Sequence, residues 1–151
     1  IAAEKIVERA DAFDDFFRRY AGDALVVDKW FSLQAAVPEA ATLDRVRELL
    51  EHPAFAMANP NRVRALIGTF AQSNPTQFNR LDGEGYAFTA DMVLQLNARN
   101  PQVAARLRSA FRNWRAMEPK RRALAEAQLR RIAGQSGLSR DVADIAERTL
   151  A

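Results

Sequence analysis

The single histidine limits the chemistry that this chain can perform. A catalytic zinc site needs about three protein ligands, drawn from histidine, cysteine and carboxylate side chains. The 151 residues contain one histidine, His52, and no cysteine. Because Pro53 follows His52, the H-E-x-x-H helix of zinc peptidases cannot form there. Ser-His and Cys-His nucleophilic arrangements are excluded by the same count. We therefore assign His52 a structural role in capping or bracing a turn, and we expect no catalytic residue and no bound zinc in this chain.

Two pairs of carboxylates remain as candidates for acid–base chemistry. Paired carboxylates alone can hydrolyse glycosides, and the closest pairs in this sequence are Asp14-Asp15 and Asp82/Glu84. The first pair lies on the polar side of a predicted amphipathic helix. The second lies in a glycine-containing loop, where acidic residues are common in turns. Because nothing near either pair indicates a tuned pKa, we do not assign catalysis to them.

Two arginines and a glutamine border the apolar stripes of two predicted helices. At 100° per residue, Arg64 lies at the edge of the stripe in residues 60–72, and Arg106 at the edge of the stripe in the helix that begins at Pro101. Gln102 lies on the same flank as Arg106. A bordering arginine can lay its aliphatic part over the core and keep its charge in water. It can also bind an anionic group, and the residues alone leave both interpretations open.

The last third of the chain is basic. Residues 1–50 carry 7 basic and 10 acidic side chains, residues 51–100 carry 4 of each, and residues 101–151 carry 11 and 5, so the three parts sum to a net charge of +3. Basic helical repeats can bind nucleic-acid phosphates. Here, however, the aromatic residues Phe111 and Trp114 fall on the core stripe and leave none free to stack on bases. We favour a solvated surface for the basic set: Arg108, Arg112, Arg115, Lys120, Arg121, Arg122, Arg130 and Arg131.

Helical periodicity accounts for most of the chain, and no strand pattern occurs. In the first segment the residues that share one face are Ile6, Ala10, Phe13, Phe17 and Tyr20. Two of the three Asn-Pro pairs lead straight into apolar-periodic runs and favour helix starts, since Asn caps well and Pro suits the first helical position. At the third pair a short helical turn is expected around Pro75–Phe78. Thr42 is expected to cap the third helix. The predicted helices are 3–20, 24–37, 42–50, 60–72, 88–98, 101–114, 119–133 and 139–150.

An internal match indicates how these helices are arranged. Aligning residues 59–70 with 100–111 pairs Asn-Pro with Asn-Pro, Leu66 with Leu107 and Phe70 with Phe111. The offset of 41 residues falls in the range of HEAT and armadillo repeats. We therefore predict one all-α domain over residues 1–151, with about eight antiparallel helices stacked as a solenoid and not as a closed bundle. Trp30 and Phe31, in a helix that is apolar on most faces, should be buried.

Composition describes an ordinary globular protein, with 48% hydrophobic and 27% charged residues. No run of about eighteen uncharged apolar residues exists, so we predict no membrane span. The first residues lack the basic start and apolar stretch of a signal peptide. The chain begins with Ile instead of Met, which favours a fragment of a longer protein. The absence of cysteine fits a reducing compartment.

Four stretches carry a family resemblance: ALVVDKWFSLQA (24–35), NPNRVRALIGTF (59–70), DGEGYAF (82–88) and LNARNPQVAARL (96–107). They are similar to the C-terminal helical domain of the bacterial aminopeptidase N family of zinc peptidases. The resemblance covers nearly the whole chain and is weakest at both ends. It implies a HEAT/armadillo-like right-handed superhelix, which agrees with the stacked arrangement.

The resemblance also implies a function. The chain would be the non-catalytic C-terminal part of a cytoplasmic zinc aminopeptidase, where it walls the active-site chamber and helps to bind the peptide. Arg64, Gln102 and Arg106 match the positions of polar residues that line this chamber above the zinc. The implied partners are the missing catalytic part, which would hold the zinc, and a peptide substrate, with no nucleic acid or membrane. The alternative is a free-standing helical-repeat scaffold that binds a protein or a nucleic acid.

Overall fold

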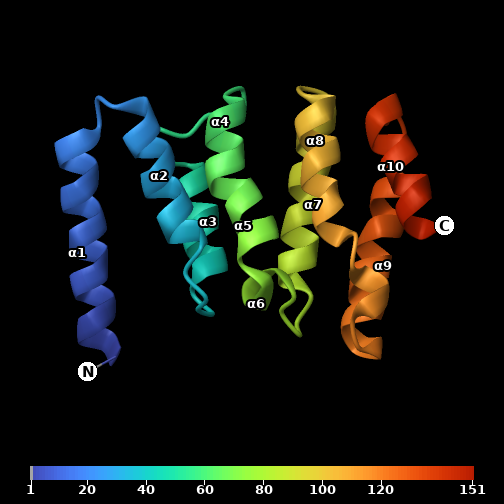
Figure 1. The fold of residues 1–151 in the computed structure, drawn as a ribbon, viewed down its shortest axis with the longest axis horizontal. Coiled ribbons are helices and arrows are strands. Elements are labelled where there is room, and N and C mark those ends of the chain that lie inside the picture. The colour runs from blue at the N-terminus through green and yellow to red at the C-terminus, as the bar shows by residue number, and fades with distance from the viewer. Residues whose placement is uncertain (1) are drawn as a thin grey trace.

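The structure is a row of helices that follow one another in chain order (Figure 1). This computed structural model describes residues 2–151, without the side chains of residues 2–4 and 6. Its α-helices are α1 (Ala2–Tyr20), α2 (Ala24–Ala35), α3 (Thr42–Leu50), α4 (Pro60–Val63), α5 (Thr69–Ser73), α6 (Pro75–Phe78), α7 (Glu84–Asn97), α8 (Pro101–Arg108), α9 (Pro119–Ala133) and α10 (Arg140–Leu150). A π-helical turn, η1 (Arg64–Gly68), joins α4 to α5, and two 3₁₀ turns, η2 (Ser109–Phe111) and η3 (Trp114–Ala116), follow α8. The described residues contain no strand, which confirms the all-α prediction.

Neighbouring helices stack in pairs, and the two ends of the chain lie at opposite ends of the row (Figure 1). Helix α2 packs against α3 and η1, α7 packs against α8 and α9, and α10 packs against α8 and α9. One apolar core runs through these contacts, from Val27 in α2 to Val142 in α10. The arrangement confirms the predicted HEAT/armadillo-like solenoid, in which each repeat buries its apolar face against the next.

The Asn-Pro pairs position the central helices. Asn59 and Asn100 accept hydrogen bonds from first-turn N–H groups of α4 and α8, so both act as the N-caps that the sequence predicts. Asn74 is buried and acts differently. Its side-chain amide donates to the carbonyls of Ala35 and Val37, at 2.9 Å each. This amide joins the end of α2 to the short turn α6, which forms as predicted.

Two helix starts differ from the sequence prediction. Thr42 is the first residue of α3 and not its N-cap, because its hydroxyl donates to the carbonyl of Val37 at 2.6 Å instead. Helix α7 begins at Glu84, four residues before the predicted start at residue 88. There, Asp82 Oδ1 accepts from the Glu84 N–H at 3.0 Å, and Gly83 takes a φ of 76° that favours glycine.

The segment predicted as one helix over 101–114 is also divided. The α-helical part ends at Arg108, and the chain continues through η2 and η3. Phe111 and Trp114 are nevertheless buried as the sequence predicts. A 3₁₀ turn has three residues per turn where an α-helix has 3.6, so other side chains after Arg108 are rotated from the directions of a continuous α-helix.

Helix α1 is less well covered than the sequence predicts. On its expected inner face, Phe13 and Phe17 are partly buried, whereas Ala10 and Tyr20 are exposed; the side chain of Ile6 lies outside the described residues. The reason is position: α1 stands at the end of the row and packs mainly against α2 (Figure 1).

Candidate functional site

Arg64 and Arg106 line one groove of about 250 Å³ between the η1–α5 segment and α8. Gly68, Gln72 and Val103 contribute to its walls. Both arginines are exposed, and neither guanidinium forms an ion pair with a described residue. The fold therefore brings together two arginines that lie 42 positions apart in the sequence and leaves their charges unpaired.

The π-helical turn places Arg64 at the groove. It buries three consecutive side chains, Ala65, Leu66 and Ile67, while Arg64 remains exposed. The Arg64 Nη2 donates to Asn61 Oδ1, which holds the side chain along the helix surface. Such single π turns inside α-helices frequently occur at functional sites.

The backbone of Arg106 fixes the opposite wall. Its carbonyl accepts from Gln72 Nε2 at 2.9 Å and from the Ser109 hydroxyl at 2.5 Å. The first bond joins α5 to α8 directly across the groove. The Arg106 guanidinium itself makes no hydrogen bond or ion pair with a described residue. Gln72 was not predicted from the sequence, since nothing local indicates that its partner lies 34 residues away.

Gln102 occupies a different place from the other two predicted site residues. It is exposed in the first turn of α8 and does not contribute to the walls of the groove. Its spacing of four residues from Arg106 puts the two side chains on the same side of the helix. The groove therefore holds Arg64 and Arg106, with Gln102 one helical turn beyond them.

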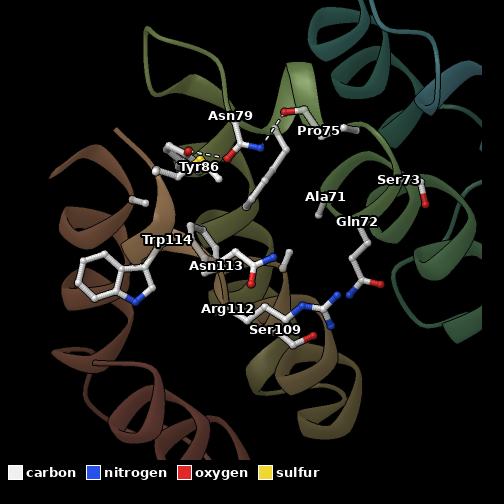
Figure 2. A pocket seen from close by; sticks show the side chains of 15 residues that line it. Ala71, Gln72, Ser73, Pro75, Asn79, Tyr86, Ser109, Arg112, Asn113 and Trp114 are labelled. Carbon is white, nitrogen blue, oxygen red and sulfur yellow. Dashed lines mark hydrogen bonds between the residues drawn. The ribbon is translucent and has the colours of Figure 1, made fainter. Parts of the chain in front are cut away.

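A larger pocket of about 470 Å³ adjoins this groove, and the two share Gln72 and Ser73 (Figure 2). Its polar walls include Arg112 and Asn113, which the sequence analysis did not assign to a site. Neither pocket is lined by an aspartate or a glutamate. Together they form a concave surface with three arginines and no acidic side chain in its walls, which suits an anionic ligand.

His52 has the bracing role that the sequence analysis assigned to it. Its Nδ1 accepts from the Ala54 N–H at 3.0 Å, which stabilises the turn after α3. Burial and the nearby charge of Arg45 lower its pKa, so the ring is held neutral more firmly than a free imidazole. The ring centroid lies 4.9–5.9 Å from those of three aromatic side chains: Phe17, Trp30 and Phe31.

Three of the four candidate carboxylates are engaged in surface ion pairs. Asp15 pairs with Arg19 at 2.9 Å, and Glu84 pairs with Arg47 at 3.0 Å. The Arg80 guanidinium, 2.9 Å from Asp82, and the Glu84 N–H lower the pKa of the Asp82 carboxyl. A general acid needs a raised pKa, so these contacts favour a structural role for the loop carboxylates.

Arg108 contradicts the predicted solvated basic surface. Its side chain is 0% exposed, and Nη1 donates to the Ile145 carbonyl at 2.7 Å and to the Thr149 hydroxyl at 2.9 Å. Burial lowers its pKa to about 10, which still leaves it charged at neutral pH. The prediction was wrong because α10, remote in sequence, packs across this side of α8.

Most of the other basic residues of this part bind groups of the protein itself. Arg115 donates to the Leu150 carbonyl at 2.6 Å, and Arg122 donates to the Met117 carbonyl at 3.2–3.3 Å. Three more form ion pairs with acidic side chains: Arg121 with Glu118, Arg130 with Glu126, and Arg131 with Asp91. Arg112 differs from these, because its side chain has no such partner among the described residues and lines the larger pocket.

Among the side chains that the structure describes, no group of three or more from histidine, cysteine, aspartate or glutamate is placed to hold a metal ion. The residues of this chain do not fit a zinc centre, which needs three protein ligands around one point. In the described part of the chain, no helix is both long enough and apolar enough to cross a membrane.

Comparison with known proteins places the chain among peptidase sequences. The model of a domain of unknown function, DUF3458_C, described as ARM repeats, matches residues 1–151. The chain is 42% identical to aminopeptidase N of Caulobacter vibrioides over 144 residues, covering 95% of the chain and 17% of that protein. It is 46% identical to aminopeptidase N of Escherichia coli over 129 residues, covering 85% of the chain and 15% of that protein. These matches confirm the resemblance seen in the sequence motifs.

One solved structure has the same fold. The crystal structure of Legionella pneumophila aminopeptidase A in complex with aspartic acid superposes with a TM-score of 0.90 at 35% identity. The match covers 99% of the chain and 17% of that protein. The chain thus spans about a sixth of the length of the relatives that it resembles.

Proposed function

The chain belongs to the DUF3458_C family of ARM-repeat domains, and from this premise we propose that it is the non-catalytic C-terminal domain of a longer zinc aminopeptidase. In that protein it walls the active-site chamber and binds the part of the peptide that lies beyond the scissile bond. The proposal extends to this chain the activity named for its aminopeptidase N and aminopeptidase A relatives.

The observation that carries the proposal is the groove between Arg64 and Arg106. Two guanidinium groups from different helices face one groove that has no acidic side chain in its walls. A guanidinium binds a carboxylate through two parallel hydrogen bonds, or it can hold backbone carbonyls. Gln102, in the first turn of α8, adds an amide near the positive end of the helix dipole. These groups suit the terminal carboxylate of a short peptide.

The hydrolytic chemistry belongs to the rest of the proposed protein, since the residues present here do not form a metal site. A bound zinc ion there would polarise the scissile carbonyl and activate a water molecule. The contribution of this domain is to bind and orient the peptide and to limit the size of molecules that enter. We place the protein in the cytoplasm, on the basis of the absence of cysteine in this part of it.

Replacing Arg106 by Ala in the longer protein tests this function. Arg106 is exposed and its side chain makes no hydrogen bond to a described residue, so folding should be little affected. Binding of di- and tripeptides should weaken by about 1–3 kcal/mol, the usual loss for a hydrogen bond to a charged group. A single-residue chromogenic substrate, too short to reach the groove, should be affected much less. The Arg64→Ala variant should behave in the same way.

Arg148 provides the matched control. It is an exposed arginine on α10, away from both pockets, and its side chain has no hydrogen-bond partner among the described residues. Arg148→Ala should leave the cleavage of every substrate unchanged. Equal losses for short and long substrates in the Arg106 variant, or no loss in either, would contradict the proposed role. A preceding sequence without a zinc-binding helix would instead favour the free-standing scaffold.

A further inference from the structure

The larger pocket is built differently from the groove beside it. Its floor consists of core side chains, including Ala71, Phe78 and Phe111, which are at most 5% exposed. Figure 2 shows the polar side chains of Gln72, Arg112 and Asn113 directed into the same space from two separate segments. An apolar floor below a few convergent polar groups is the usual construction of a ligand site.

The 3₁₀ turn η2 brings Arg112 toward the side of α8 that carries Arg106. On an uninterrupted α-helix, six positions at 100° each would put the two side chains about 120° apart. With about 120° per residue after Arg108, as in a 3₁₀ turn, the separation falls to roughly 40°. The chain does pass into η2 at Ser109, and Arg112 lines the pocket that adjoins the groove of Arg106. The end of α8 thus creates a second cationic position along one concave surface.

Several polar groups in this pocket are available to a ligand. The side chains of Arg112 and Asn113 are exposed and make no hydrogen bond to any described residue. Gln72 uses its Nε2 to bind the Arg106 carbonyl, which leaves its Oε1 as a free acceptor. The remaining amide in the wall, Asn79, is already used, since it donates to the Pro75 carbonyl and accepts from the Tyr86 hydroxyl. One free cation beside free amide groups suits a carboxylate attached to a peptide backbone.

We propose that this pocket is a distal subsite for a carboxylate, in which Arg112 pairs with an acidic group, a side chain or the C-terminus, at the far end of a longer peptide. The inference rests on the proposed function of the neighbouring groove. Asn113 and Gln72 hydrogen-bond the peptide backbone, and the apolar floor takes the aliphatic part of the side chain. The protein therefore prefers acidic peptides among those long enough to reach Arg112.

The spacing of the two arginines sets the length of that peptide. Six residues at a rise of about 1.5–2.0 Å separate Arg106 and Arg112 by roughly 9–12 Å along the helix axis. An extended peptide covers about 3.3–3.6 Å per residue. A peptide that uses the second subsite is therefore about three residues longer than one that ends at Arg106.

The test uses the longer protein and peptides of increasing length, each ending in Glu or in Gln, with a free or an amidated C-terminus. Comparing Glu with Gln in amidated peptides isolates the side-chain carboxylate, and comparing free with amidated Gln peptides isolates the terminal one. For the longer peptides, the unmodified protein should cleave each peptide that carries a carboxylate, from the side chain or from the C-terminus, with a kcat/KM roughly tenfold or more above that of the amidated Gln peptide. In Arg112→Ala this ratio should fall to near one, and Arg148→Ala should retain it.

A charge reversal provides a second variant. Arg112→Glu should shift the preference of the longer peptides from terminal Glu to terminal Lys, a gain that damage to the fold cannot produce. A carboxylate preference that survives in both Arg112 variants overturns the distal subsite. If Arg106→Ala still weakens di- and tripeptide binding in that case, the proposed function is retained and only the distal subsite is rejected. If Arg106→Ala has no effect either, both proposals fail.

Discussion

Arg108 Nη1 donates a hydrogen bond of 2.7 Å to the carbonyl of Ile145, from inside the interface between α8 and α10. No carboxylate lies within ion-pair distance of this guanidinium among the described residues. The last carbonyls of a helix lack partners within it and carry the negative end of its dipole. Trp114 and Arg115 donate to two of these last carbonyls, on Thr149 and Leu150. Trp114 and Arg115 thus cap the end of α10, and Arg108 binds the same helix one turn earlier.

Two substitutions of Arg108 should distinguish the contribution of its side-chain volume to stability from the contribution of its buried charge. Arg108→Ala leaves a cavity and removes the hydrogen bonds to Ile145 and Thr149, so we expect the free energy of unfolding to fall by about 2–4 kcal/mol. Arg108→Met fills the volume and removes a buried charge whose Nε and Nη2 have no hydrogen-bond partner among the described residues. We expect this variant to remain within about 1 kcal/mol of the unmodified chain. Urea unfolding measures both, and an equally large loss in Arg108→Met would show that the charge itself stabilises α10.

Trp30 holds the first helices together. It is 2% exposed and its indole N–H donates to the Phe13 carbonyl at 2.7 Å, which fastens α1 to α2. Trp30→Ala should therefore cost about 3–5 kcal/mol in thermal or urea unfolding. Leu25, on the same helix, is 80% exposed, and Leu25→Ala is the control that should change stability little. A melting temperature for Trp30→Ala within a degree or two of the unmodified chain would contradict the described packing of α2.

Two glycines should respond in opposite directions to alanine. A Cβ at Gly85 would lie 2.3 Å from the carbonyl oxygen of Gln77 and 2.4 Å from that of Phe78, so the backbone of the two segments must separate. We expect Gly85→Ala to lose about 3 kcal/mol or more. A Cβ at Gly68 would meet nothing closer than 3.9 Å within a continuous helical segment. Gly68→Ala should gain about 0.5–1 kcal/mol. Circular dichroism melts check both, and a stable Gly85→Ala variant would refute the close approach.

The lowered pKa of His52 predicts that the stability of the fold depends on pH, and NMR of this single imidazole can test the prediction. Burial and the charge of Arg45 lower its pKa in the folded chain below the ordinary value of about 6.5. The unfolded chain then binds the proton more readily, so stability falls as the pH drops below about 6.5 and levels off below the folded pKa. Because the chain has one histidine, NMR titration of the imidazole measures that pKa directly. A value at or above 6.5 would contradict the prediction, and His52→Gln should remove the slope between pH 7 and 5.

Local signals in the sequence determined the helices and most of their ends. Asn59 and Asn100 cap helices as predicted, since an N-cap depends only on the two or three residues that follow it. The apolar stripes correctly identified Leu66, Phe70 and Leu96 as buried, because a helical period relates residues within one segment. The 41-residue offset indicated the stack, since repeats of that length cannot bury their apolar faces alone.

Tertiary structure alone decided which polar side chains meet. The α-helical periodicity of the sequence placed Arg108 and Arg112 on one solvated face. In the structure α10 covers Arg108, and the 3₁₀ turn after α8 directs Arg112 into a pocket. The bond from Gln72 to the Arg106 carbonyl joins residues with no shared local pattern. A helical period gives the direction of a side chain around its own axis, whereas burial and partners depend on which distant helix packs there. Contacts between distant segments, set by packing of the whole stack, therefore decide the site.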